Sequence, residues 1–281
     1  MNGMKPNQAQ KWKIKALKER VETNKAYVPF VIVTETHFKP KHNSAEISIK
    51  GYNVQRGDRS TKKKNGGVAL YYDENLVPSD SITYTDNYCQ AVTLYIKTLN
   101  LIISGVYRPP SAKDNEEVNS FRSAIHQISV FIEKYPTAEI QMYGDFNMRY
   151  MSWESLTMKA GHGERITEQI CYEILINFMR DHFLSQHVNE NTRKDLSILD
   201  LVITNNEEAI HSVIVEKTRF SDHDMVITKL LCDKLTQTKE EETFKPTHPF
   251  DKLNWFKAKW GDIKTELSHF WKALQSKGPS I

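Results

Sequence analysis

The stretch MYGDFNM at residues 142–148 places a carboxylate and a carboxamide directly after an apolar run that is typical of a buried strand. Asp145 and Asn147 lie two positions apart, where that strand would end. Buried polar groups without partners are costly, so the pair is expected at an open strand end, where it can bind a hard cation or orient a water. The alternative is an Asx-type turn that only closes the strand. The tetrapeptide GDFN alone does not separate these interpretations.

Polar residues also follow or interrupt three other apolar runs. Glu35 comes just after the run at 27–33, and Tyr107 ends the run at 101–107. Taken singly, each is an ordinary residue at a strand end. Asp200 differs because it lies inside the aliphatic run ILDLVI. A carboxylate there needs a cation, a histidine or a backbone partner to offset its desolvation.

The segment SDHD at 221–224 precedes the last apolar run and combines a hydroxyl group, two carboxylates and an imidazole. His223 is a competent general base near neutral pH if a buried carboxylate holds one ring nitrogen. Asp200 is the natural candidate for that carboxylate. Ser221 is not expected to be an acyl-transfer nucleophile, because the G-x-S-x-G pattern is missing around it.

The candidate site residues are rich in oxygen donors and contain no cysteine, which suits Mg²⁺ or Mn²⁺ and not zinc. They are Glu35, Tyr107, Asp145, Asn147, Asp200, Asp222 and His223. A metal ion can neutralise charge on a pentacoordinate phosphate while a histidine activates water. The set therefore predicts hydrolysis of a phosphate ester.

Apolar periodicity predicts strands that alternate with a few helices, which favours an α/β protein with mixed sheets. Helices are expected at 9–23, 115–135 and 165–182. Strands are expected at 27–33, 51–54, 66–72, 91–96, 101–107, 139–143, 197–205, 210–216 and 225–231. A hairpin is expected across residues 98–100, between two of these strands.

Composition predicts an intracellular protein that does not cross a membrane. No apolar run approaches the roughly 18 residues that a membrane span needs, and the first residues have no apolar signal core. Three widely spaced cysteines indicate reduced thiols and not a disulfide framework. We expect one domain at 1–232, a polar linker at 233–249 and an amphipathic helix within 250–281.

Basic residues concentrate in the first 64 positions, which hold 15 Lys and Arg against 5 Asp and Glu, whereas the remainder holds 23 against 30. Clusters at 11–20 and 56–64 could meet an anionic polymer such as nucleic acid. The alternative is a solvated helix face and a solvated loop, and charge alone favours that alternative.

Several motifs, taken in chain order, resemble the endonuclease/exonuclease/phosphatase superfamily. They are TETH at 34–37, GGVA at 66–69, VYRPP at 106–110, GDFN at 144–147, LDLVITN at 199–205 and SDH at 221–223. More narrowly, the chain resembles the apurinic-type endonuclease domain of non-LTR, LINE-like retrotransposons. VYRPP, NTR at 191–193 and SILDLVITN at 197–205 point to that branch. The resemblance spans about residues 2–231.

The resemblance implies a DNase-I-like fold, a four-layer sandwich of two packed mixed β-sheets flanked by helices, with the site at one edge. It implies that Glu35 is a metal ligand, that Asp222 lies near the metal, and that Tyr107 forms a hydrogen bond with the scissile phosphate. Asp145 would act on the water or the leaving group, with Asn147 orienting it. His223 would act on the phosphate or the water and would be held by Asp200. DNA contacts would fall to Arg108, Thr192 and Ser221.

The sequence departs from this family at its start. The family opens with a strand that ends in N-x-N-G or N-x-D-G, whereas this sequence begins at the second asparagine of that motif, Asn2. We therefore expect the first strand to be missing, with Asn2 as the remaining metal ligand from the motif. The helix expected within 250–281 resembles the connector to a reverse transcriptase domain, which does not follow in this sequence.

The resemblance implies a Mg²⁺-dependent endonuclease that nicks one strand of double-stranded DNA, in the nucleus. The nick would leave a 3′-hydroxyl that primes reverse transcription of a retrotransposon. Two alternatives stay open. One is a catalytically impaired DNA-binding remnant, which the expected loss of the first strand favours. The other is a phosphoesterase of the same superfamily that acts on a lipid head group.

Overall fold

A computed structural model describes most of the first 231 residues, all within the compact unit Met1–Lys234. The described ranges are 15–21, 27–39, 42, 47–59, 66–110, 115–159, 166–193, 197–218 and 221–231. Asn2, the linker expected at 233–249 and the helix expected within 250–281 lie outside these ranges.

The largest element of the fold is a six-stranded mixed sheet in the order β10-β11-β7-β6-β5-β4. Its strands are β4 (Asp80–Thr85), β5 (Gln90–Ile96), β6 (Leu101–Tyr107), β7 (Glu139–Asp145), β10 (Ser185–Gln186) and β11 (Asp200–Thr204). The hairpin expected across 98–100 joins β5 to β6, which confirms that prediction. Strand β7 runs parallel to β6, and β11 runs antiparallel to β7.

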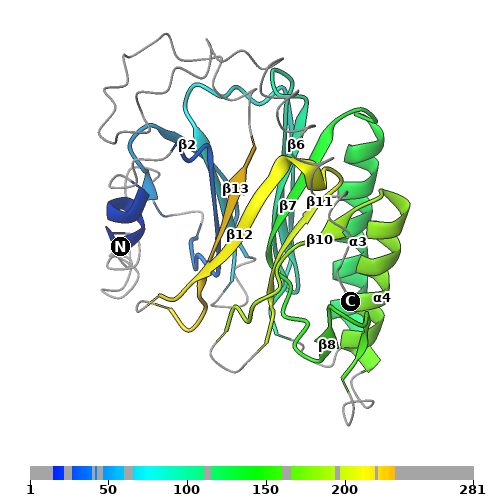
Figure 1. The fold of residues 1–281 in the computed structure, drawn as a ribbon. Helices are drawn as coiled ribbons and strands as arrows, with labels where there is room; N and C mark the ends of the chain where they lie inside the picture. The colour runs from blue at the N-terminus through cyan, green and yellow to red at the C-terminus, as the bar shows by residue number, and fades with distance from the viewer. Residues whose placement is uncertain are drawn as a thin grey trace, which may run out of the picture. The chain divides into compact units, whose positions relative to one another are not determined.

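The remaining long strands form two antiparallel groups. One is the sheet β1-β3-β2, built from β1 (Phe30–Thr34), β2 (Tyr52–Gly57) and β3 (Val68–Asp73). The other is the pair β12 (Ile210–Glu216) and β13 (Met225–Leu230). Both groups lie on the same side of the six-stranded sheet (Figure 1). Within the described ranges, no strand joins β1 to β13, so the second layer consists of two groups and not of one continuous mixed sheet.

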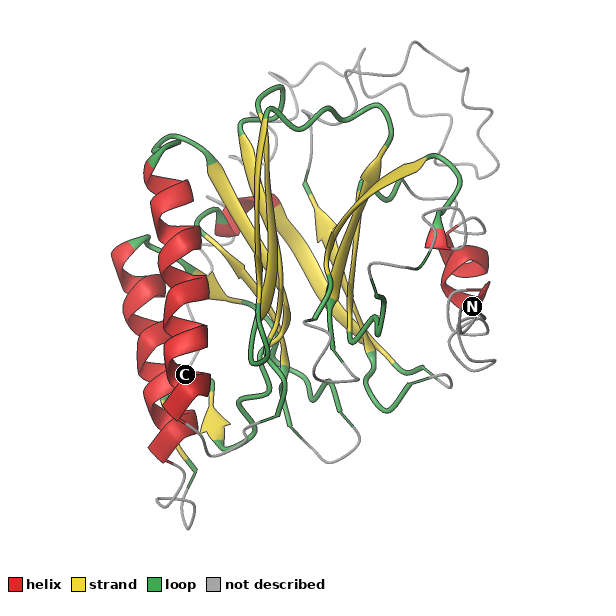
Figure 2. Ribbon diagram, turned by 180° about the vertical axis from the view of Figure 1, so that it is seen from behind, coloured by secondary structure: helices red, strands yellow, loops and turns green. Residues whose placement is uncertain are grey.

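Helices cover the opposite side of the six-stranded sheet. They are α3 (Asn115–Glu133) and α4 (Ile166–Asp181), and they lie side by side (Figure 2). Their apolar faces meet the sheet in one core that includes Phe121, Ile128, Leu175 and Phe178. Residues 15–21 are helical and lie against the outer side of the smaller sheet through Leu17 and Val21. The α/β sandwich that the sequence predicts is confirmed.

Short elements complete the described chain. They are β8 (Met151–Ser152), β9 (Thr157–Met158) and the 3-10 helix η1 (Glu207–Ala209). Cys89 and Cys171 are free and buried, and Cys232 lies outside the described ranges. No helix in the described part of the chain is both long and apolar enough to cross a membrane.

Close packing of β6 against β7 requires the glycine of the GDFN motif. Gly144 has a φ of 151° and lies opposite Val106 in the parallel register. A Cβ atom on Gly144 would stand 1.8 Å from the carbonyl oxygen of Val106, which no side chain can tolerate. The glycine therefore allows β7 to run beside β6 up to Asp145.

A buried ion pair fixes the loop that follows β6. The guanidinium of Arg108 pairs with the carboxylate of Glu117 on α3, and both side chains are almost completely buried. Arg108 also donates to the carbonyl oxygens of Phe146 and Asn147, at 2.9 and 3.2 Å. Arg108 therefore ties α3 to the loop that carries the GDFN motif.

Replacing Glu117 with alanine is expected to lower the free energy of unfolding by about 3–5 kcal/mol, because it leaves a buried guanidinium without its counter-charge. Urea denaturation followed by circular dichroism measures this change. Glu133→Ala, on the exposed side of the same helix, is the control and should cost no more than about 0.5 kcal/mol. Equal losses for the two variants would contradict the role given to the ion pair.

Candidate active site

Strand register brings three of the predicted site residues into one row. Tyr107, Asp145 and Asp200 occupy paired positions on the adjacent strands β6, β7 and β11, because Asp145 lies opposite both of the others. They lie 38 and 55 residues apart in the chain. The row lies at the edge of the six-stranded sheet where β6 and β7 end and β11 begins.

Asn147 holds the carboxylate of Asp145 in place. Its backbone N–H donates to Asp145 Oδ1 at 3.0 Å, and its side-chain amide donates to Asp145 Oδ2 at 2.8 Å. The same amide also donates to the carbonyl oxygen of Arg108 at 2.8 Å. Asn147 has a φ of 49°, a left-handed conformation that asparagine tolerates well. The Asx-type turn and the oriented carboxylate are therefore one structure, and the two interpretations of GDFN do not exclude each other.

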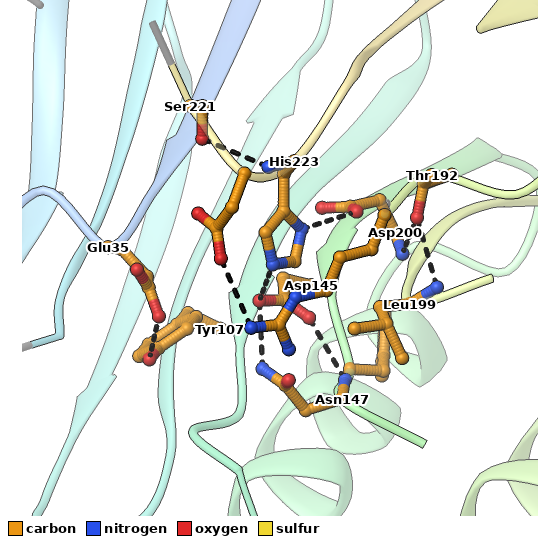
Figure 3. A network of polar contacts seen from close by, with 12 residues as sticks. Glu35, Tyr107, Asp145, Asn147, Thr192, Leu199, Asp200, Ser221 and His223 are labelled. Atoms are coloured by element: carbon orange, nitrogen blue, oxygen red, sulfur yellow. Dashed lines mark hydrogen bonds and ion pairs between the residues drawn. The ribbon is translucent and has the colours of Figure 1, made fainter. Parts of the chain in front are cut away.

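His223 lies between two of the carboxylates (Figure 3). Its Nδ1 is 2.8 Å from Asp200 Oδ2, and its Nε2 is 3.9 Å from Asp145 Oδ2. The second distance is too long for a direct hydrogen bond, but a water or a phosphate oxygen can bridge it. The hydrogen bond to Asp200 fixes the ring and leaves Nε2 directed toward Asp145.

Asp200 makes His223 a cation at neutral pH. Burial of the imidazole lowers its pKa, but the hydrogen bond and charge of Asp200, together with the charges of Asp145 and Asp222, outweigh this effect and raise the pKa to about 9. A general base at neutral pH, which the sequence predicts, would need an unprotonated ring. The structure instead favours an imidazolium that stabilises negative charge.

The surroundings of Asp145 also raise its pKa, which for a carboxyl group favours the uncharged form. The carboxyl group is 1% exposed, and its pKa lies well above its usual range because burial and the charges of Asp200 and Glu35 disfavour ionisation. The charge of His223 and the hydrogen bond from Asn147 partly offset this rise. A carboxylate with a raised pKa is a stronger proton acceptor than an ordinary aspartate.

Glu35 enters the site from the sheet that faces this row. The Tyr107 hydroxyl donates to Glu35 Oε1 at 2.8 Å, while the glutamate side chain is otherwise exposed. Burial and the nearby charge of Glu35 raise the pKa of Tyr107, so the phenol keeps its proton and acts as a donor. Glu35 has a φ of 50°, in the sparsely populated left-handed region. Backbone strain of this kind is found where a side chain must be aimed.

The donors at this site fit a hard divalent cation. Glu35, Asp145 and Asp200 bring three carboxylates together, and the mutual repulsion that raises the pKa of Asp145 is what a cation would relieve. Atoms of Asp145, Asp200 and His223 all lie within 4.8 Å of one another, but His223 and Asp200 already bond to each other. Glu35 is therefore the better candidate ligand, with water completing the coordination that Mg²⁺ prefers.

Two residues near His223 have different surroundings. Ser221 Oγ accepts a hydrogen bond from the backbone N–H of His223 at 3.2 Å, which shapes the turn before β13. Asp222 is exposed and pairs with Arg193 at 3.1 Å. Burial tends to raise the pKa of Asp222, but hydrogen bonding and the charges of His223 and Arg193 lower it overall. Asp222 therefore acts on the site through its charge, and its predicted place near a metal stays a prediction.

Arg108 and Thr192 do not lie where the sequence analysis expects them, because each has a completely buried side chain that cannot face DNA. Thr192 Oγ1 instead accepts the backbone N–H groups of Leu199 and Asp200, at 3.0 and 3.1 Å. It thereby holds the start of β11. No pattern in the sequence shows this role, because it depends on contacts across a loop. Arg193 belongs to the NTR motif, but the sequence analysis assigns it no role, and its ion pair with Asp222 is seen only in the folded chain.

A family model described as endonuclease-reverse transcriptase matches residues 101–227. No curated protein sequence matches the chain. Among solved structures, the catalytic domain of Xenopus laevis APE2 aligns with a TM-score of 0.55 and 12% identity, over 76% of this chain and 86% of that one. The endonuclease domain of TRAS1, a telomere-specific non-LTR retrotransposon, aligns with a TM-score of 0.50 and 15% identity, over 81% and 93%.

A mannosyl-6-phosphatase from Bacteroides thetaiotaomicron has the same fold, with a TM-score of 0.51 and 10% identity over 79% of this chain and 92% of that one. The shared architecture thus includes both nucleases and a phosphatase. These solved structures share the fold of this chain, and the endonuclease-reverse transcriptase model matches the part of it, residues 101–227, that holds Tyr107, Asp145, Asp200 and His223.

Proposed function

We propose that this protein is a Mg²⁺-dependent endonuclease that nicks one strand of double-stranded DNA and leaves a 3′-hydroxyl end. The observation that carries the proposal is the convergence of Tyr107, Asp145 and the Asp200–His223 pair at one strand edge. The match to a model described as endonuclease-reverse transcriptase supports the retrotransposon branch, as does the fold shared with the TRAS1 endonuclease domain. In that setting the 3′-hydroxyl would prime reverse transcription in the nucleus, with a reverse transcriptase domain as partner.

The geometry divides the chemical work between Asp145 and His223. Asp145, with its raised pKa, is placed to take a proton from the attacking water. His223, as an imidazolium fixed by Asp200, is placed to stabilise the charge that develops on the phosphate. The gap of 3.9 Å between Nε2 of His223 and Oδ2 of Asp145 leaves room for a phosphate oxygen or the water.

Glu35 and Tyr107 form the opposite side of the site. Mg²⁺ held by Glu35 would neutralise charge on a non-bridging phosphate oxygen. The Tyr107 hydroxyl donates to Oε1 of Glu35 and so fixes the carboxylate (Figure 3). Outer partners of this kind set the orientation of a metal ligand.

In the presence of Mg²⁺ the protein is expected to convert supercoiled plasmid to the nicked circle. Asp145→Ala and His223→Ala should each lower the rate by about 100-fold or more, because each removes a proton-transfer or charge-stabilising group. His211→Ala, at an exposed histidine on β12, is the matched control and should not change the rate. Extension of the nick by a DNA polymerase without prior phosphatase treatment reports the 3′-hydroxyl.

Nicking that persists in both site variants would show that the assigned site is wrong. Salt-sensitive binding of duplex DNA without any turnover would favour the impaired remnant instead. Release of phosphate from a small phosphomonoester without plasmid nicking would favour the phosphoesterase alternative, to which the shared fold of the mannosyl-6-phosphatase lends support.

The pH dependence of nicking should show the protonation state of His223. The active form has a protonated ring with a pKa raised to about 9, so activity should fall as pH rises through about 9. Asp200→Asn removes the hydrogen-bonded charge that raises this pKa, so the alkaline limb of the profile should move to lower pH. Asp222→Asn removes a smaller contribution and should move the limb less. An alkaline limb that does not move in Asp200→Asn contradicts this assignment.

Tyr107→Phe is expected to weaken Mg²⁺ binding, because the carboxylate of Glu35 loses the donor that orients it. Loss of such an outer partner typically costs about 10–100-fold in metal affinity. The Mg²⁺ concentration that gives half-maximal nicking should rise by a factor in that range. Tyr150→Phe, outside the row of site residues, is the control. An unchanged Mg²⁺ requirement in Tyr107→Phe would separate Tyr107 from metal binding.

A further inference from the structure

Gln90 extends the row of site residues onto a fourth strand. It is the first residue of β5 and lies opposite Tyr107 in the antiparallel register, so the two side chains point to the same face of the sheet. The row therefore runs from Gln90 through Tyr107 and Asp145 to Asp200. The side chain of Gln90 is completely buried, which is costly for a primary amide unless its polar atoms form hydrogen bonds.

The two ends of the Gln90 amide bind the backbone of two different segments. Its Oε1 accepts the backbone N–H of Gly67 at 2.9 Å, and its Nε2 donates to the carbonyl oxygen of Asp86 at 2.7 Å. Gly67 immediately precedes β3 of the smaller sheet, whereas Gln90 belongs to the six-stranded sheet. The Gln90 side chain therefore ties the two β layers together beside the site.

The backbone of Gly66 and Gly67 in turn holds the loop that carries Glu35. The carbonyl oxygen of Gly67 accepts the N–H of Thr36 at 3.3 Å, and that of Gly66 accepts the N–H of His37 at 2.7 Å. These bonds continue the pairing of β1 with β3 beyond the ends of the two strands. They support the backbone of Glu35, which has a φ of 50° in the strained left-handed region.

The glycine pair allows these groups to approach one another closely. A Cβ atom on Gly67 would stand 2.6 Å from Thr36 Oγ1, and one on Gly66 would stand 3.1 Å from Gln90 Oε1 and 3.2 Å from Tyr107 Cε1. Both glycines also have a positive φ, of 96° and 125° respectively. Gln90, Tyr107 and the Glu35 loop therefore meet at the same short stretch of backbone.

The other end of the Gln90 amide is anchored to α3 through Asp86. Asp86 Oδ1 accepts the hydroxyl of Ser120 on α3 at 2.6 Å, and it also accepts two backbone N–H groups of its own loop at 2.6 and 2.9 Å. The carbonyl oxygen of Asp86 is thus held in place by bonds to the core of the protein. Gln90 links this fixed point to the loop that carries Glu35.

We propose that Gln90 is a positioning residue for metal binding, which holds the Glu35 loop at a fixed distance from the row on the six-stranded sheet. This inference rests on the part of the proposed function in which Glu35 binds the metal, and it makes no assumption about the DNA. Mg²⁺ requires nearly octahedral geometry with ligands at about 2.0–2.1 Å, so a small displacement of one carboxylate weakens its binding. Gln90 acts on Glu35 through backbone hydrogen bonds.

The test measures the binding of Mn²⁺ alone to the full-length chain, from the loss of the electron paramagnetic resonance signal of the free ion. Gln90→Met keeps the length of the side chain but removes both hydrogen bonds. It should raise the Kd for Mn²⁺ about tenfold, at the lower end of the effect of losing an outer partner of a metal ligand.

Thr93→Val is the matched control. Thr93 is also completely buried on β5 and bonds to Ser104 at 2.7 Å, but its side chain points to the opposite face of the sheet. The substitution removes a buried hydrogen bond from the same strand, so it should lower the melting temperature without changing the Kd for Mn²⁺.

A double-mutant cycle with Glu35→Gln tests whether Gln90 acts through Glu35. Glu35→Gln should itself weaken Mn²⁺ binding, and adding Gln90→Met should cause little further loss, because the ligand that Gln90 positions is already gone. Fully additive losses would contradict the inference. If Gln90→Met does not fold, Gln90→Asn replaces it in every arm, because this shorter amide cannot bridge Asp86 and Gly67 and should show the same loss.

The outcomes separate this inference from the proposed function. If Glu35→Gln weakens Mn²⁺ binding while the Gln90 variant behaves like Thr93→Val, the inference about Gln90 is overturned and the metal-binding role of Glu35 stands. If the wild type does not bind Mn²⁺, or if Glu35→Gln binds it as tightly as the wild type does, both are overturned.

Discussion

The site depends on the parallel pairing of β6 with β7. That pairing sets Tyr107 opposite Asp145, and the antiparallel pairing of β11 sets Asp200 opposite Asp145 on its other side. Gly144 makes the pairing possible, because a side chain there would collide with the carbonyl oxygen of Val106. If one of these strands shifted its register by one residue, its site side chain would point to the other face of the sheet, and the row would no longer form.

The strand register brings the carboxylates close enough to repel one another. The structure reduces this repulsion at Asp200 and accommodates it at Asp145. The negative charge of Asp200 is balanced by the imidazolium of His223, to which it is hydrogen-bonded, and the pKa of His223 rises as a result. Asp145 stays buried, held by Asn147, with a raised pKa. One carboxylate thus maintains a cation while the next becomes a better base. Pairs of groups whose pKa values are pushed in useful directions are common at active sites.

Sequence patterns predict most of the long strands and helices of the described chain, because each buried face repeats at a period of two or about 3.6 residues. They miss β4 (Asp80–Thr85), the last strand in the order of the six-stranded sheet. They also single out Asp200, since a carboxylate inside ILDLVI needs a partner, and the structure supplies His223. They do not reveal that Arg108 and Thr192 are internal supports, because both roles depend on contacts that only the folded chain creates.

Protonation of His223 is the central claim, because it decides which residue activates water. Its most direct test is an NMR titration of the imidazole, assigned by comparison with His223→Ala. The account predicts that the ring keeps its proton up to a pKa of about 9. A value at or below the ordinary 6.5 would contradict it and return the role of general base to the histidine.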